Sequence, residues 1–181
     1  MNKHLTHIIT TAVAIALVGL PASAIATSGS TGHSAAAATP RCHTSQLRVS
    51  IVDREGAAGT TYWNLALRNV GRTTCHMIGY PGVGLVDSNS RLINVQVKRS
   101  PVTPSLFVTV RPGQQAYFTF GYPSLIGACS RHFSSHGVQI IPPNEFQRIV
   151  LRTGRFDVCS PSSAVANPQV WTVRPTPHFE A

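Results

Sequence analysis

Histidines next to cysteines are the residues in this chain whose types and spacing could support metal chemistry. His43 follows Cys42, His76 follows Cys75, and a C-x-x-H sequence begins at Cys129. A disulfide between Cys42 and Cys75 would bring the two neighbouring histidines close together, which makes them the candidates for a small metal site. Structural zinc sites, however, use a repeated C-x-x-C with H-x-x-x-H, and the sequence has no such repeat. We therefore predict no metal and no other cofactor.

Signatures of enzymes are missing from the sequence. It contains no G-x-S-x-G, H-E-x-x-H, P-loop or G-x-G-x-x-G pattern. Only 6 acidic residues are available for a catalytic carboxylate pair. Ser135 and His136 are neighbours in sequence, but on a strand they would face opposite sides. We predict a non-catalytic binding or envelope-associated protein. Two alternatives stay open: a hydrolase or metal-dependent enzyme whose site forms only in space, and a purely structural envelope protein.

Basic residues are in excess, 15 against 6 acidic ones, which gives a net charge of +9. Arg48 and Arg68 point outward from one predicted hairpin, and Arg148 and Arg152 from another. If both hairpins lie in one sheet, the four side chains form a basic face for an anionic ligand; in different sheets, the charges are dispersed. The expected partner is an anionic cell-envelope polymer or another exported protein. Nucleic acid is not expected, because the domain lacks a dense basic run.

The first 26 residues have the features of an export signal. Lys3 precedes an apolar run over 8–20, and Pro21 and small residues follow it. Small residues allow cleavage after Ala24 or Ala26. The run is shorter than the roughly 20 residues that span a bilayer. We therefore predict a signal peptide over 1–26 and a secreted, extracytoplasmic mature chain without a transmembrane anchor.

The elements after the signal divide into three parts. Residues 27–40 are rich in Ser and Ala and predict a flexible linker. Residues 41–174 show short alternating runs separated by Gly, Pro, Asn and Asp, and 175–181 form a tail. The alternation predicts an all-β domain, an immunoglobulin-like antiparallel β-sandwich with Trp63 in its core, and a closed barrel is the alternative. Strands are expected around residues 47–52, 63–68, 75–78, 83–86, 93–97, 108–110, 118–120, 138–141, 148–151 and 170–173. A loop is expected over 53–61.

The four cysteines predict two disulfides, since an exported chain meets an oxidising environment. Sequence alone allows three connectivities. Cys42 and Cys75 flank the first predicted hairpin, and Cys129 and Cys159 flank the second in the same way. Residues just outside the two strands of a hairpin emerge at the same end. The pairings Cys42–Cys75 and Cys129–Cys159 are therefore expected.

The stretch 69–85, NVGRTTCHMIGYPGVGL, combines a cysteine with several glycines and a proline. Such residues mostly reflect the needs of the backbone, so we predict a structural corner rather than an active-site loop. Asn69 to Gly71 would form a turn, Cys75 would supply half of a disulfide, and Tyr80 would pack over the corner.

The same stretch resembles a known family. Its N-x-G, Cys75 and Gly79-Tyr80-Pro81-Gly82-Val83 are similar to the N-x-G…C…GYPG hallmark of an exported actinobacterial domain, the domain of unknown function 4232. Further similarity, over about residues 42 to 174, lies at Cys42, Pro112-Gly113, Cys129, Ile141-Pro142-Pro143 and Val158-Cys159. The resemblance implies an extracytoplasmic β-sandwich with disulfides and no established activity. Many similar proteins are lipoproteins or carry membrane segments, whereas this chain has no cysteine at its predicted cleavage site.

Overall fold

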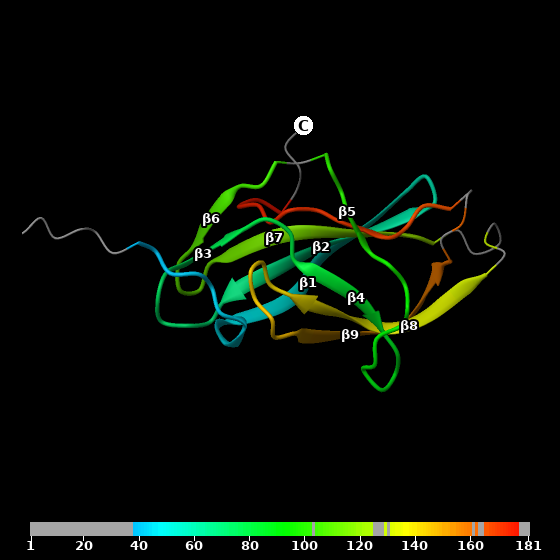
Figure 1. Cartoon of the computed structure of the whole chain (residues 1–181), viewed down its shortest axis with the longest axis horizontal. Helices are drawn as coiled ribbons and strands as arrows, with labels where there is room; N and C mark the ends of the chain where they lie inside the picture. Colours follow the sequence, from blue (N-terminus) through cyan, green and yellow to red (C-terminus); the bar gives the residue numbers. More distant parts are fainter. Residues whose placement is uncertain are drawn as a thin grey trace, which may run out of the picture. The chain divides into compact units, whose positions relative to one another are not determined.

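In the part of the chain that the structure describes, ten strands form three sheets (Figure 1). The computed structural model describes residues 38–102, 104–124, 129, 131–160, 162 and 165–177. The predicted signal peptide, most of the linker and the last residues of the tail lie outside the described residues. The strands are β1 (Leu47–Ala57), β2 (Thr60–Asn69), β3 (Cys75–Ile78), β4 (Gly82–Val86), β5 (Lys98–Arg99), β6 (Phe107–Val110), β7 (Gln115–Pro123), β8 (His132–Ile141), β9 (Ile149–Cys159) and β10 (Gln169–Val170).

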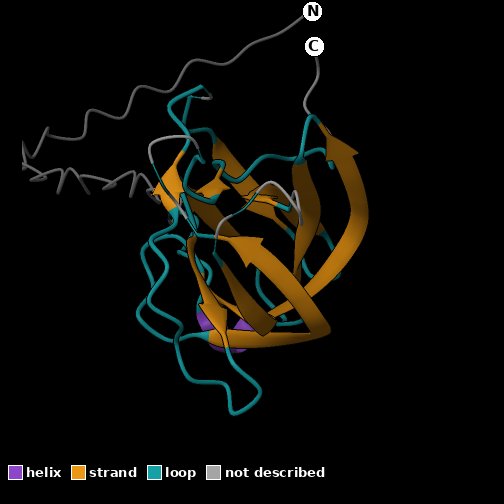
Figure 2. Cartoon of the chain, turned by 90° about the vertical axis from the view of Figure 1, so that its right-hand side faces the viewer, coloured by secondary structure: helices purple, strands orange, loops and turns teal. Residues whose placement is uncertain are grey.

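The sheets have the strand orders β1-β2-β7-β10-β5, β3-β6 and β4-β8-β9. All pairings between these strands are antiparallel except that of β5 with β10. Within the described part of the chain, the one helical segment is a short 3₁₀ turn over Thr44–Gln46 (Figure 2). The predicted all-β class is confirmed.

The core lies between the five-stranded and three-stranded sheets. Trp63 on β2 and Phe118 on β7 are buried on one side, and Leu85 on β4 and Ile140 on β8 on the other. Trp63 is 2% exposed, as predicted for the core aromatic, and its ring meets that of Phe120 edge-on at 6.0 Å. The two layers enclose one apolar interior, which is the arrangement of a β-sandwich. Its immunoglobulin-like assignment stays a prediction.

The first hairpin is longer than predicted. β1 continues to Ala57 and β2 begins at Thr60, so most of the loop expected over 53–61 is paired strand. Ala58 and Gly59 make the turn with φ of 46° and 79°. Two positive φ values suit the tight turns that match the twist of an antiparallel pair. The residues before the turn are exposed, and an exposed strand end needs no apolar side chains to form.

The prediction of a strand over residues 93–97 is wrong. These residues lie outside the strands, and the pairing occurs at Lys98–Arg99 instead. The Val95 N–H donates to the Ile93 carbonyl at 2.7 Å, a tight turn that uses groups which a strand ladder would need. Val95 is nevertheless buried in the core. The alternating apolar residues thus indicate that this segment is buried, not that it pairs as a strand.

Two disulfides join Cys42 to Cys75 and Cys129 to Cys159. They close loops with sequence separations of 33 and 30 residues. These are the two pairings that the hairpin argument predicts. A disulfide that closes a loop of this length stabilises the fold by roughly 3–4 kcal/mol in the chain-entropy model.

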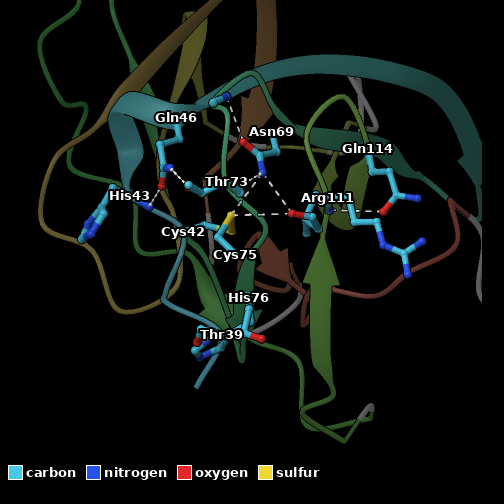
Figure 3. Close-up of a disulfide and its surroundings, with 12 residues drawn as sticks. Thr39, Cys42, His43, Gln46, Asn69, Thr73, Cys75, His76, Arg111 and Gln114 are labelled. Carbon is cyan, nitrogen blue, oxygen red and sulfur yellow. Dashed lines mark hydrogen bonds between the residues drawn. A yellow bond between two sulfur atoms is a disulfide. The ribbon is translucent and has the colours of Figure 1, made fainter. Parts of the chain in front are cut away.

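Asn69 organises the corner that follows β2 (Figure 3). Its buried side chain donates from Nδ2 to the carbonyls of Thr73 at 2.8 Å and Val110 at 2.9 Å. Its Oδ1 accepts from the Gly71 N–H at 2.9 Å. A Cβ on Gly71 would lie 3.0 Å from Gln46 Nε2, so the turn is tightly enclosed. The N-x-G part of the stretch is a structural corner, as predicted.

The second bend of this stretch lies at Gly79 and Tyr80. Gly79 has a φ of +93°, and its carbonyl accepts from the Val173 N–H at 2.9 Å. The Tyr80 hydroxyl donates to the Ser100 carbonyl, and the ring packs against the core with the Arg99 guanidinium 5.5 Å from its centre. Tyr80 therefore covers the corner and ties it to the segment before β6.

Candidate functional site

Arg48 and Arg68 lie directly opposite each other on the outer face of the five-stranded sheet. They are register partners on β1 and β2, and both side chains are exposed. Their neighbours in sequence, Leu47 and Leu67, are buried, so the two arginines face away from the core. Opposed residues on antiparallel strands have Cβ atoms about 4.5–5.5 Å apart, and like charges in this position destabilise the pair.

The acidic residues do not neutralise this pair. Among the described residues, the ion pairs are His43 with Glu145 and Arg155 with Asp157. Arg48 Nη1 donates to the Leu47 carbonyl at 3.1 Å, and Arg68 Nε donates to the Gly113 carbonyl at 3.2 Å. Both guanidinium groups are thus held by main-chain oxygens and keep their charge exposed.

Arg148 and Arg152 have a different environment. Arg148 Nη1 donates to Gln139 Oε1 at 3.0 Å and to the Ser90 carbonyl at 3.3 Å. Arg152 donates to the Ser88 carbonyl at 3.0 Å and to Ser90 Oγ at 2.9 Å. Both side chains therefore hold the loop that follows β4 against the three-stranded sheet.

The four predicted arginines do not form one face. Arg48 and Arg68 belong to the hairpin of the five-stranded sheet, whereas the second hairpin, β8–β9, belongs to the three-stranded sheet. The condition for a shared basic face, one sheet for both hairpins, is not met. The structure offers two separate pairs, of which Arg48 and Arg68 are the pair with the greater free hydrogen-bonding capacity.

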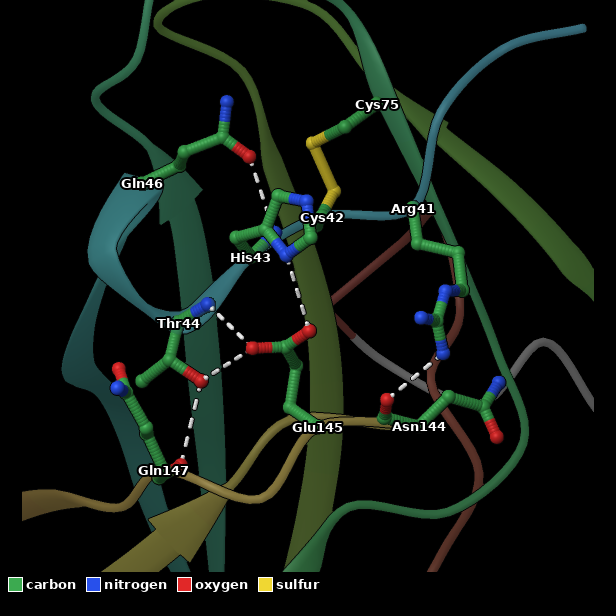
Figure 4. A network of polar contacts seen from close by, with 9 residues as sticks. All are labelled: Arg41, Cys42, His43, Thr44, Gln46, Cys75, Asn144, Glu145 and Gln147. Atoms are coloured by element: carbon green, nitrogen blue, oxygen red, sulfur yellow. Dashed lines mark hydrogen bonds and ion pairs between the residues drawn. A yellow bond between two sulfur atoms is a disulfide. The ribbon is translucent and has the colours of Figure 1, made fainter.

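A second polar cluster surrounds Glu145 in the β8–β9 connection (Figure 4). Glu145 Oε1 lies 3.2 Å from His43 Nδ1. Glu145 Oε2 accepts from the backbone N–H and the hydroxyl of Thr44, both at 3.0 Å. Next to it, Arg41 Nη1 donates to the Asn144 carbonyl at 3.0 Å. These contacts fasten the β8–β9 connection to the segment beside the Cys42–Cys75 disulfide.

The hydrogen bonds of the Glu145 cluster favour the ionised form of the carboxylate. Burial raises the pKa of the Glu145 carboxyl, but the hydrogen bonds from Thr44 and His43 outweigh it and leave the pKa below its ordinary value. The single proton of the Thr44 hydroxyl is shared between Glu145 Oε2 at 3.0 Å and the Gln147 carbonyl at 3.2 Å. His43 Nδ1 contacts the carboxylate, so the hydroxyl proton of Thr44 is directed to Glu145 and Gln147 and not to the histidine that could activate it as a nucleophile.

The structure does not bring the two candidate metal ligands together. The His43 ring faces Glu145 (Figure 4). His76 Nδ1 instead lies 2.8 Å from the Thr39 carbonyl (Figure 3), and the His76 ring stacks on Phe107 with a centre-to-centre distance of 4.4 Å. The disulfide does bring the two segments together, and the Cys42 N–H donates to the His76 carbonyl at 2.9 Å, but each histidine ring has a partner of its own. Over the described ranges, no group of three or more His, Cys, Asp or Glu residues could hold a metal ion.

Sequence reasoning missed Glu145. It lies 102 residues from His43, and nothing in the linear spacing links the two. The one available signal is its place in the turn after Pro142-Pro143, and in the structure this turn lies against the segment just before β1. The contact between Glu145 and His43 therefore could not be predicted from a single sequence.

A family model described as a domain of unknown function (DUF4232) matches residues 42–173. A search of curated proteins found no match. In the part of the chain that the structure describes, no helix is long and apolar enough to cross a membrane.

Proposed function

The chain belongs to the family of the domain of unknown function DUF4232, and from this premise we propose that it is an exported, non-catalytic module that binds an anionic polymer of the cell envelope. The proposed binding surface is the outer face of the five-stranded sheet around Arg48 and Arg68. The observation that carries the proposal is the placement of these two like charges opposite each other, with no carboxylate paired to them among the described residues.

An anion between the two guanidinium groups would relieve their repulsion. Arginine has five N–H donors in a planar fork that matches carboxylate and phosphate groups. Arg48 and Arg68 each donate one hydrogen bond to a main-chain carbonyl. Most of their donors are thus available to a ligand, and charge-assisted hydrogen bonds are about twice as strong as neutral ones.

The charge of the whole chain supports a polymeric anion over an isolated one. With a net charge of +9, the protein attracts polyanions over distances longer than one contact. The predicted export signal and the two disulfides favour a partner outside the cytoplasm. The lack of a catalytic sequence signature, together with the structural use of Glu145 and Thr44, supports binding without chemistry.

The test is a binding titration of the oxidised protein with polygalacturonate, a polymer with one carboxylate on each sugar. We expect binding at low salt that weakens strongly as the salt concentration rises. The double variant Arg48→Gln/Arg68→Gln should lose about 10-fold or more in affinity, since it loses two charge-assisted contacts.

The matched control is Arg131→Gln/Arg155→Gln, which removes the same charge from exposed positions at the three-stranded sheet. If both double variants lose affinity equally, net charge rather than the Arg48–Arg68 pair causes binding, and the proposed site is wrong. Absence of binding at low salt by the unmodified protein would overturn the proposed function itself.

A further inference from the structure

We infer that the anionic polymer carries sugar hydroxyl groups, which bind in a polar groove beside Arg68; this inference rests on the proposed function. The groove has a volume of about 460 Å³ and lies at the turn between β6 and β7. Its size falls within the range of about 300–1,000 Å³ that is typical of small-molecule sites. Its polar walls come from Thr109, Gln114, Gln115 and Tyr117.

The groove is continuous with the arginine pair. Arg68 on β2 is the register partner of Arg48 on β1 and of Gln115 on β7. These three residues therefore form one row across the outer face. Tyr117 lies two residues farther along β7 and projects to the same face. The Arg68 side chain donates to the carbonyl of Gly113, which itself lines the groove. A ligand bound to both arginines would therefore extend into the groove.

The chemistry of the groove fits hydroxyl groups rather than further charge. No residue in its lining carries a charged side chain. Amide and hydroxyl groups both donate and accept hydrogen bonds, as sugar hydroxyls do. Among the described residues, no protein group hydrogen-bonds to the side chains of Thr109, Gln115 or Tyr117, so these groups are available. A bare polyanion would use the arginines and leave the groove unused.

The test compares two carboxylate polymers that differ in their hydroxyl groups: polygalacturonate and poly-L-glutamate of matched length. We expect the protein to bind polygalacturonate about 10-fold tighter at equal salt, because several hydrogen bonds in the groove add to the arginine contacts. The variants Thr109→Val, Gln115→Met and Tyr117→Phe keep the side-chain volume and remove hydrogen-bonding groups. Combined, they should abolish the preference and leave the affinity for poly-L-glutamate unchanged.

The outcomes separate this inference from the proposed function. Equal binding of both polymers, reduced in each case by Arg48→Gln/Arg68→Gln, would overturn the sugar groove and leave the anion site in place. A preference that survives the triple variant, with unchanged thermal unfolding, would also overturn the groove. If neither polymer binds, the proposed function fails, and the inference fails with it.

Discussion

Asn69 Nδ2 donates a buried hydrogen bond, 2.9 Å long, to the carbonyl of Val110, a residue 41 positions later in the chain. The bond joins the end of β2 to the end of β6, next to the Cys42–Cys75 disulfide. The same side chain also bonds the turn at Gly71 and Thr73. One amide thus joins the end of β2, the turn that follows it and the end of β6.

The first prediction concerns this amide. Asn69→Ala should lower the free energy of unfolding by about 2–4 kcal/mol, because it removes the buried hydrogen bond to the Val110 carbonyl, the partly buried one to the Thr73 carbonyl and the one from the Gly71 N–H. Asn69→Asp should destabilise as well, since a carboxylate can accept from Gly71 but cannot donate to either carbonyl. Chemical denaturation of the oxidised protein measures both effects.

The control for Asn69 is Thr73→Ala. The Thr73 hydroxyl accepts one exposed hydrogen bond from Gln46 at 3.1 Å, so its loss should cost little. If Asn69→Asp is as stable as the unmodified protein, the donor function of the amide is not what holds the corner.

Local rules of the backbone explain what could be predicted from sequence here. The residues that flank a hairpin emerge together whatever the rest of the fold does, so Cys42 and Cys75 could be paired in advance. Glycines at Gly71 and Gly79 mark bends for the same reason, because their need for space or for positive φ is local.

Contacts between distant segments explain what could not be predicted. The alternation of Ile93, Val95 and Val97 is the same for a paired strand and for an unpaired segment that packs on the core. Likewise, Arg68 and Arg148 point outward from similar hairpins, and only the order of strands decides that they belong to different sheets. Strand order depends on long-range pairing, which one sequence does not display.

The second prediction concerns the register shift in β8 near Gly137. A Cβ at Gly137 would lie 2.4 Å from the Leu151 carbonyl oxygen and 3.2 Å from the Arg152 Cα. Both are backbone atoms of the paired strand β9, so they cannot move without opening the ladder. Gly137→Ala should therefore cost more than about 2 kcal/mol of unfolding free energy.

Gly56→Ala is the matched control for Gly137. A Cβ there meets nothing within 4 Å, and the position lies in the exposed part of β1. We expect this variant to be neutral or slightly stabilising, because alanine restricts the unfolded chain more than glycine does. Equal stability of the two variants in thermal unfolding would contradict the prediction, because it would show that the β9 backbone at Leu151 moves at little cost to accommodate the added methyl group.

The third prediction concerns the pH dependence of the Glu145 cluster. In the folded protein the hydrogen bonds from Thr44 and His43 outweigh burial and lower the pKa of the Glu145 carboxyl from its ordinary value of 4.5. A group with a lowered folded pKa contributes stability above its unfolded pKa, and this stability is lost as the pH falls through the folded pKa. The unmodified protein should therefore lose stability as the pH is lowered below about 4.5.

Glu145→Gln isolates the contribution of this carboxylate. The variant should be less stable than the unmodified protein at pH 7, and the difference should shrink as the pH falls below 4.5, the ordinary pKa of a glutamate carboxyl. Asp157, whose pKa is lowered mainly by the hydrogen bond from Ser134, contributes acid sensitivity in the same direction to both proteins. It therefore cancels in the comparison. Denaturation at a series of pH values measures the difference, and a difference that stays constant from pH 7 to 3 would show that the charge of Glu145 does not stabilise the connection between β8 and β9.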